Sequence, residues 1–329
     1  MNSRTHLEID KEMDEAREGR AASPISGPDE ARGSRKGSLL ALAYCVLLAA
    51  FYFKPLLSLV MYAIGTSLHS HVILIPLISA YLINLDRSKR PAFGRPSFLF
   101  GALFAAVAVA ALLILQKFLG QASLNDRLAL ITFSFLSFLY AGAFLFIGRK
   151  GVVAAAFPLA FLLFMIPLPD AAAEWLETGS MLASAEAAAV LFGLTATPVL
   201  RDGLLFQLPG ILIEVAQECS GIRSSWVLFI TSLLASHLFL RTTWRRVALL
   251  AFVIPLGIIR NGFRILVIAL LCVHMGPQMI DSVVHRRGGP VFFVLSLVPL
   301  FLLMAWLRWN ERRAFAKRNG KPPAAEFAA

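Results

Sequence analysis

Long apolar runs separated by short polar and basic loops make up most of the sequence. Runs near the roughly 20 residues that a helix needs to cross a bilayer lie at about residues 38–64, 72–85, 98–118, 127–147, 152–168, 223–240, 247–272 and 290–307. The pattern predicts an all-α polytopic membrane protein with about eight transmembrane helices. Lys54 and Pro55 interrupt the first run and the second run is short, so these two runs could instead form a different pair of spans or a re-entrant segment.

The loops between the apolar runs predict the orientation of the chain. Basic residues cluster at 87–95, 149–150, 241–246 and 308–318, and all four clusters lie in the cytoplasm if the amino terminus does. Residues 1–37 mix acids, bases, Gly, Pro and Ser, which predicts a disordered cytoplasmic tail and no cleavable signal peptide. A transmembrane domain at 38–307 and a basic cytoplasmic tail at 308–329 complete the expected organisation.

The segment at 169–222 is expected to form structure on the outer face. Residues 171–193 are rich in strong helix formers with interspersed glutamates, which predicts an amphipathic helix at the membrane surface. Residues 198–216 contain short extended runs separated by Asp-Gly and Pro-Gly turn signals, which predicts a small β-meander. This outer insertion would deliver the chain to Cys219.

Composition supports a membrane protein and excludes other classes. Of the 329 residues, 58% are hydrophobic and 16% are charged, which is too apolar for a soluble globular chain. The net charge of +11 could indicate nucleic-acid binding, but the basic clusters between apolar runs would face lipid headgroups, so we expect no nucleic-acid partner. Cys45 and Cys272 lie inside apolar runs and are expected to be core residues. The sequence has no zinc-site spacing and no glycine-rich phosphate loop, so we expect no metal or cofactor.

Three polar side chains from separate segments are expected to meet at the outer leaflet. Cys219 precedes the sixth expected span, Arg264 lies roughly 12 Å below the outer end of the seventh, and His285 precedes the eighth. A thiolate is a nucleophile, a guanidinium stabilises a thiolate or an oxyanion, and an imidazole carries protons. The set suits acyl transfer through a thioester. Residues that could support it are Glu218, Arg223, Arg260 and Asn261, and, at an outer edge, Ser70 and His71.

Each of the three residues also has a simpler interpretation. Cys219 could be a small packing residue near a helix end. Arg264 could extend to a lipid phosphate, and His285 could be a loop residue that faces the headgroups. The residues by themselves leave these interpretations open.

The motifs around these residues resemble a known family. ECSGIRS at 218–224, NGFRI at 261–265 and HRRGGPVFF at 285–293 together resemble the exosortase and archaeosortase family, membrane-embedded cysteine transpeptidases that process proteins with a short carboxyl-terminal sorting signal. Similar stretches at 70–82, 157–169 and 200–217 extend the resemblance over about residues 65–305. It implies that Cys219 is the nucleophile, that Arg264 occupies the family's Arg position and that His285 occupies its His position. Gly288 and Pro290 stand where many members have aromatic residues.

The resemblance also implies the partners and the compartment. The expected substrates carry a carboxyl-terminal recognition motif, a transmembrane helix and a basic cluster, and the acceptor is an unidentified nucleophile such as water, a lipid or a polysaccharide. The expected location is the cell inner membrane, with both termini cytoplasmic and the active site on the outer face. With water as the acceptor the enzyme would be a protease. A non-catalytic transporter or assembly factor for envelope polysaccharide, in which Arg260 and Arg264 bind anions, stays open as the alternative.

Overall fold

The structure, a computed structural model, describes residues 28–66, 68–85, 95–118, 120–195, 197–215, 220–276, 278–279 and 289–318. Residues 1–27, most of the tail expected to be disordered, lie outside these ranges. The chain forms two compact units. Unit 1 contains Met1–Ser58, Ile75–Gly120 and Leu130–Ile166, and unit 2 contains Leu59–Leu74, Gln121–Ala129 and Pro167–Ala329.

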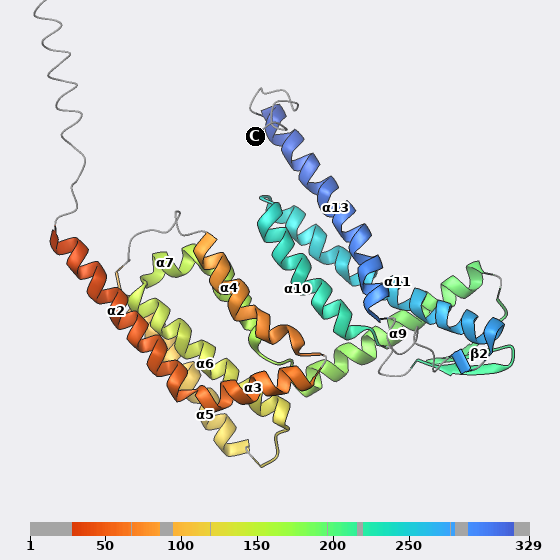
Figure 1. The fold of residues 1–329 in the computed structure, drawn as a ribbon, viewed down its shortest axis with the longest axis horizontal. Helices are drawn as coiled ribbons and strands as arrows, with labels where there is room; N and C mark the ends of the chain where they lie inside the picture. Colours follow the sequence, from red (N-terminus) through yellow and green to blue (C-terminus); the bar gives the residue numbers. More distant parts are fainter. Residues whose placement is uncertain are drawn as a thin grey trace, which may run out of the picture. The chain divides into compact units, whose positions relative to one another are not determined.

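Unit 1 is a group of apolar helices joined by buried hydroxyl groups (Figure 1). The elements that contribute to it are α2 (Pro28–Phe51), α3 (Phe53–Gly65), α4 (Leu74–Leu85), α5 (Phe98–Phe118), α6 (Leu124–Phe146), α7 (Gly148–Ala154), α8 (Ala156–Phe161) and the 3-10 helix η3 (Leu162–Met165). Ser134 of α6 donates a hydrogen bond to the carbonyl of Ala108 in α5 at 2.9 Å, and its oxygen lies 2.7 Å from the hydroxyl of Tyr52. Because the Ser134 proton is used, Tyr52 donates to Ser134. These bonds link the bend between α2 and α3 to α5 and α6.

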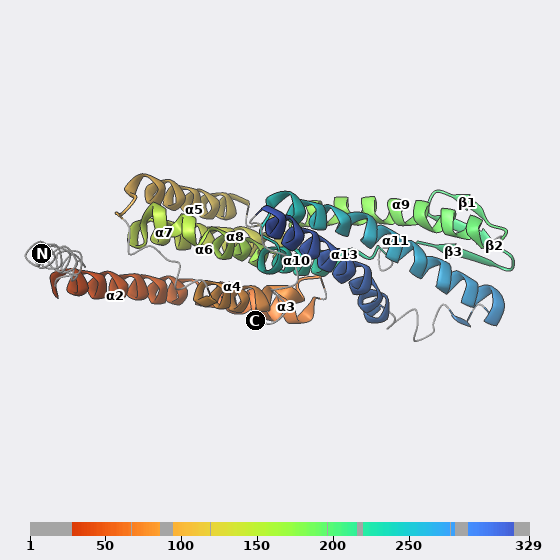
Figure 2. The ribbon, with the colours of Figure 1, turned by 90° about the horizontal axis from the view of Figure 1, so that it is seen from above.

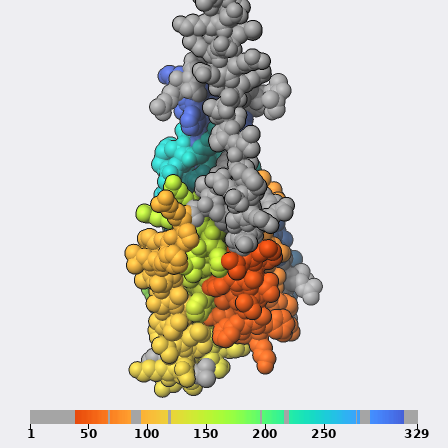
Figure 3. Space-filling view, turned by 90° about the vertical axis from the view of Figure 1, so that its left-hand side faces the viewer, coloured from red at the N-terminus to blue at the C-terminus, as the bar shows by residue number. Residues whose placement is uncertain are grey.

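The outer surface of unit 1 is strongly apolar, as a lipid-facing surface must be. Figure 3 views this surface, with α2 in red-orange and α5 in yellow-orange. Large side chains on both helices are more than half exposed; they include Leu42, Leu47, Phe51, Leu99 and Leu113.

The eight expected spans are not confirmed. Among the described residues, five helices are long and apolar enough to cross a membrane, or up to seven if each of two bent pairs is one span. The first expected span is the pair Leu39–Phe51 and Phe53–Gly65, bent by 67°, and the fifth is the pair Gly148–Ala154 and Ala156–Met165, bent by 73°. The second is only a short apolar helix, Ser70–Leu85.

Prolines explain both bends. A proline ring clashes with the carbonyl of the residue four positions earlier, which ends or kinks a helix there. Pro55 lies four residues after Phe51, where α2 ends, and Pro158 lies four residues after Ala154, where α7 ends. Pro255 and Pro299, by contrast, lie inside the continuous helices α11 (Thr243–Met275) and α13 (Gly289–Arg318).

Unit 2 is built around α11, a single helix of 33 residues. Its first half packs with α10 (Ile222–Phe239) and α13 in an apolar core that includes Leu228, Val253 and Leu300. Its second half packs against α9 (Asp170–Leu194) and a small sheet in another core that includes Phe192, Phe206 and Ile265. Figures 1 and 2 show α9 beside this second half, with the sheet near their ends. The α11 helix therefore connects a helical layer with α9 and the sheet.

The sheet confirms the expected meander. In the described part of the chain, β1 (Leu200–Asp202), β2 (Leu205–Leu208) and β3 (Ile211–Glu214) form an antiparallel sheet in the order β1-β2-β3. Each of the two expected turns contains a glycine with a positive φ angle, +58° at Gly203 and +79° at Gly210. Glycine adopts such angles without steric cost. Phe206 and Ile213 are paired across the strands and point into the core.

The helix expected at 171–193 is confirmed as α9. Its buried face includes Ala185, Ala188 and Phe192. The exposed ion pair between Glu186 and Arg201, at 2.8 Å, joins α9 to β1, and the hydrogen bond from Arg201 holds the pKa of Glu186 below its usual value. The position of α9 at the membrane surface stays a prediction.

Candidate active site

The α10 helix and the first half of α11 form an antiparallel hairpin. The 18 residues of α10 extend roughly 27 Å at 1.5 Å per residue, close to the bilayer core of about 30 Å. Arg260 lies 17 residues after the start of α11. At this position α11 is again beside the amino-terminal end of α10, and Arg260 contacts Gly221. The open end of this hairpin is the place where the sequence puts the candidate site.

Arg260 is buried at this end and holds the start of α10. Its Nη2 donates to the carbonyl oxygen of Gly221 and to the hydroxyl oxygen of Ser225, both at 3.1 Å. The residue is 7% exposed, and its buried Nη1 has no hydrogen-bond partner among the residues that the structure describes. A buried cation is costly unless it is paired, so one face of this guanidinium is available to an acceptor.

The residue that directly follows Cys219 is fixed from another side. Ser220 is buried, and its carbonyl oxygen accepts a hydrogen bond of 2.6 Å from the hydroxyl of Ser180 on α9. Gly221 has a left-handed φ of +71°, and a Cβ there would lie 2.8 Å from the side chain of Asn261. The chain that enters α10 therefore passes between α9 and α11 at a point where only glycine fits.

Two further glycines allow the helices to approach. A Cβ at Gly257 would lie 2.8 Å from the hydroxyl oxygen of Ser225, and a Cβ at Gly262 would lie 2.8 Å from the Cβ of Ala187. Small residues that permit close contact are typical of helix interfaces in membranes. Gly257 and Gly262 flank Arg260 in the sequence. This spacing of glycines could have predicted the face of α11 that packs against other helices.

Several predicted residues meet at this end. Asn261 is buried beside Gly221, and Arg264 lies one helical turn after Arg260 on the same face of α11 and is partly buried. Arg223 belongs to the first turn of α10 and is exposed. Ser180 and Ser225 were missed, because nothing in the sequence distinguishes them from other serines in apolar helices.

The helix that carries Arg264 ends later than expected. The seventh expected span ended at residue 272, whereas α11 continues to Met275, and its second half packs against α9 and the sheet. Arg264 thus lies where α11 passes from one core to the other. The depth of Arg264 in the membrane stays a prediction.

The remaining predicted residues are distributed as follows. Cys219, Glu218 and His285 lie outside the described residues. Ser70 and His71 lie in the 3-10 helix η1 (Ser70–Ile73), where Ser70 is exposed and a ring nitrogen of His71 lies 3.1 Å from the carbonyl oxygen of Leu68. Cys272 is buried in the core around α9, as expected, but Cys45 is exposed on α2, so its assignment to the core was wrong.

A second polar cluster lies at the amino terminus of α9. The side-chain amide of Asn125 donates to the carbonyl of Leu168 and to the carboxylate of Asp170, both at 2.7 Å. In the same unit, His69 is 4% exposed, and its ring lies 5.5 Å from that of Tyr62. Burial lowers the pKa of His69 to about 4, so this imidazole is neutral at physiological pH. Within the described residues, no group of three His, Cys, Asp or Glu side chains could hold a metal ion.

Comparison with known proteins identified a family. The family model described as transmembrane exosortase (Exosortase_EpsH) matches residues 63–302, which include the whole of α9, the sheet, α10 and α11. No curated protein and no solved structure matches the chain.

Proposed function

Because the chain belongs to the transmembrane exosortase family, a family of membrane transpeptidases in general, we propose that it cleaves partner proteins at a carboxyl-terminal sorting signal. The cleaved protein is transferred to an envelope acceptor through a thioester on Cys219. The proposed substrates carry a recognition motif, a transmembrane helix and a basic cluster. The proposed location is the inner membrane, with the site on the outer face and both termini in the cytoplasm.

The proposed reaction has two halves. The Cys219 thiolate bonds to the carbonyl carbon of the substrate, the carbon–nitrogen bond breaks, and His285 gives a proton to the leaving amine. The acceptor then attacks the thioester, passes its proton to His285 and releases the thiolate. Arg264 stabilises the oxyanion that forms at the substrate oxygen in each half.

The single observation that carries this proposal is the fixation of Ser220 and Gly221, the two residues that follow Cys219. Ser180 holds the Ser220 carbonyl, and Arg260 holds the Gly221 carbonyl. Ser220 follows Cys219 directly, and consecutive Cα atoms are about 3.8 Å apart, so the anchored pair offers a rigid attachment for the proposed nucleophile. Rigid support of a reacting group is what catalysis by proximity requires.

The contacts of Arg260 also support a division between the two arginines. Arg260 donates to a backbone carbonyl and to Ser225, so we assign it a positioning role. Arg264, one turn further along α11, is the arginine that matches the family motif. The mutual repulsion of two guanidinium groups at this spacing favours an anion between them, as an oxyanion or a thiolate would be.

The test is co-expression with a candidate tail-bearing substrate, whose processing is followed by gel mobility. We expect Cys219→Ala and Arg264→Ala to abolish the processed band while the membrane protein still accumulates. Cys45→Ala, the matched control on an exposed face of α2, should process normally. Unchanged processing by Cys219→Ala would refute the thioester, and loss of function in Arg264→Ala alone would favour the non-catalytic transporter.

Mass spectrometry of the mature substrate separates transfer from hydrolysis. An acceptor attached to the new carboxyl end would support the transpeptidase. A free carboxylic acid would identify water as the acceptor and make the enzyme a protease.

A further inference from the structure

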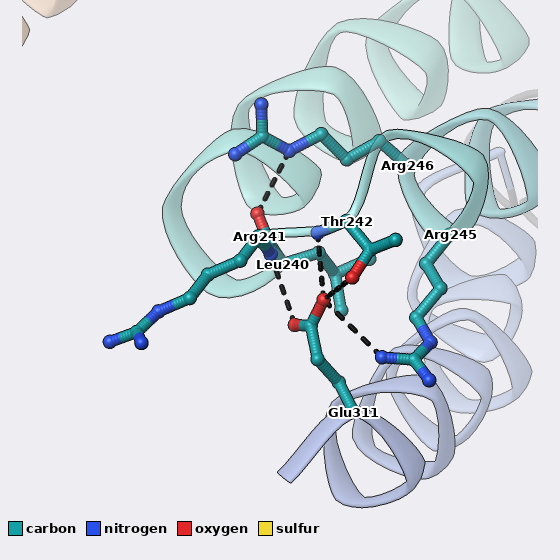
Figure 4. Close-up of polar contacts among 6 residues, drawn as sticks. All are labelled: Leu240, Arg241, Thr242, Arg245, Arg246 and Glu311. Atoms are coloured by element: carbon teal, nitrogen blue, oxygen red, sulfur yellow. Dashed lines mark hydrogen bonds and ion pairs between the residues drawn. The ribbon is translucent and has the colours of Figure 1, made fainter. Parts of the chain in front are cut away.

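The other end of the α10–α11 hairpin carries a buried carboxylate surrounded by arginines. Glu311 of α13 is 4% exposed. Its carboxylate accepts the backbone N–H groups of Arg241 at 3.0 Å and Thr242 at 2.7 Å, together with the hydroxyl of Thr242. It also forms an ion pair of 3.3 Å with Arg245 (Figure 4). Glu311 thus joins α13 to the turn between α10 and α11.

Glu311 neutralises only one of the neighbouring cations. The guanidinium groups of Arg241 and Arg246 point away from its carboxylate in Figure 4, and Arg246 donates from Nε to the carbonyl of Leu240 at 2.8 Å. Arg308, one turn before Glu311, lies over the ring of Phe239 at 5.3 Å. Within the described part of the chain, none of these three arginines forms an ion pair with an acidic side chain.

The surrounding helices cannot supply the missing negative charge. Glu311 is the sole acidic residue in the sequences of α10, α11 and α13. The excess positive charge of Arg241, Arg246 and Arg308 must therefore be balanced by something other than these helices. An anion with several oxygen atoms suits guanidinium groups, which bind phosphate in a bidentate manner.

The exposed aromatic side chains at this end suit the level of lipid headgroups. Trp244 and Trp309 are 60% and 43% exposed, and guanidinium groups lie over both rings, Arg245 at 5.4 Å and Arg313 at 3.3 Å. Tryptophan is enriched at the boundary between hydrocarbon and water. This end also lies roughly 27 Å along α10 from Gly221, so the two ends match the two faces of a bilayer.

We propose that Arg241, Arg246 and Arg308 bind the phosphate of an anionic phospholipid at the end of α10, α11 and α13. The Glu311–Arg245 pair holds the three helices together, and the lipid headgroup balances the remaining charge. This inference depends on the membrane location of the chain and not on the chemistry at Cys219. It adds a lipid-binding site on the membrane face opposite the candidate active site.

The test measures binding of phosphatidylglycerol to the purified full chain in a neutral detergent by native mass spectrometry. We expect phosphatidylglycerol to stay bound at concentrations at which phosphatidylcholine does not bind. The double variant Arg241→Gln, Arg246→Gln should weaken binding about 25-fold, since each arginine near an anionic lipid contributes about fivefold. Arg245 and Glu311 stay unchanged, so the fold is retained, and an unchanged melting temperature verifies this.

The matched control is the double variant Arg149→Gln, Lys150→Gln, which removes the same charge from the basic cluster of unit 1. It should change the affinity by less than about twofold. If both double variants lost the same affinity for phosphatidylglycerol, binding would depend only on the net charge of the protein. That result would refute the proposed site. Displacement by equimolar inorganic phosphate would identify a site for free anions, and binding of an acidic peptide in place of the lipid would identify a protein-docking surface; either result overturns the proposal.

Discussion

Acidification should destabilise the protein through His69. The side chain is 4% exposed and lies against Tyr62, and burial, the main cause, together with the neighbouring His71 lowers its pKa to about 4 against an ordinary value of 6.5. The nearby Asp170 acts in the opposite direction but does not compensate. The folded protein therefore keeps this imidazole neutral in a pH range in which an unfolded chain protonates it.

The sign and size of the effect follow from linkage. Between pH 6.5 and pH 4 the unfolded state binds more protons than the folded state, so the free energy of unfolding falls as the pH falls through this window. For these two pKa values the loss between pH 7 and pH 5 is about 2 kcal/mol. Above pH 7 His69 should contribute no pH dependence, because it is neutral in both states.

The assay is thermal unfolding in a non-ionic detergent at pH 7 and pH 5. The wild type should lose stability on acidification, and His69→Phe, which keeps a ring against Tyr62, should lose about 2 kcal/mol less. His71→Gln serves as the control and should keep most of the pH response. If His69→Phe and the wild type lost the same stability between pH 7 and pH 5, the buried neutral imidazole would be refuted.

Two further predictions concern the two ends of the hairpin. Gly221→Ala should abolish substrate processing and cost about 1–2 kcal/mol of stability, because the left-handed φ of +71° disfavours alanine and the new Cβ would lie 2.8 Å from Asn261; normal processing would show that the approach at Gly221 is not required. Glu311→Ala should destabilise the chain by about 3–5 kcal/mol, because it leaves two backbone N–H groups without an acceptor and Arg245 buried without a partner. Glu311→Gln, which keeps one acceptor oxygen, should cost less, and equal melting temperatures for the two variants would contradict this account.

Local signals predicted much of unit 2. The Asp-Gly and Pro-Gly pairs specified the two turns of the sheet, because glycine reaches a positive φ without steric cost. Helix formers specified α9, and the apolar run at 223–240 predicted α10 to within one residue at each end. In each of these cases the deciding information lies within a few residues of the element that it predicts.

Hydropathy alone could not fix the number of spans. It treats Pro55 and Pro158 like Pro255 and Pro299, yet the first two lie at sharp bends and the last two lie inside continuous helices. Whether a proline breaks a helix depends on the packing around it, because neighbouring groups can satisfy the freed carbonyl. This tertiary information is absent from a count of apolar residues.

The contacts at the candidate site could not be predicted from the sequence. The motif around Arg264 lies in the part of α11 that reaches the start of α10, whereas the bonds from Arg260 to Gly221 and from Ser180 to Ser220 depend on how three helices pack. Sequence spacing cannot show which carbonyl a buried arginine contacts. The predicted roles of Cys219, Arg264 and His285 therefore stay predictions that the proposed experiments test.

The fixed length of the hairpin has a consequence for the choice of membrane. Glu311 and its partners close one end and Arg260 closes the other, and a helix cannot stretch to change the distance of roughly 27 Å between them. In a bilayer thicker than this distance, the protein must tilt or the lipids must thin around it, because both polar ends cannot otherwise reach water. Such hydrophobic mismatch costs fractions of a kcal/mol per Å, so acyl-chain length becomes a determinant of where the protein resides and of how close its candidate site lies to the membrane surface.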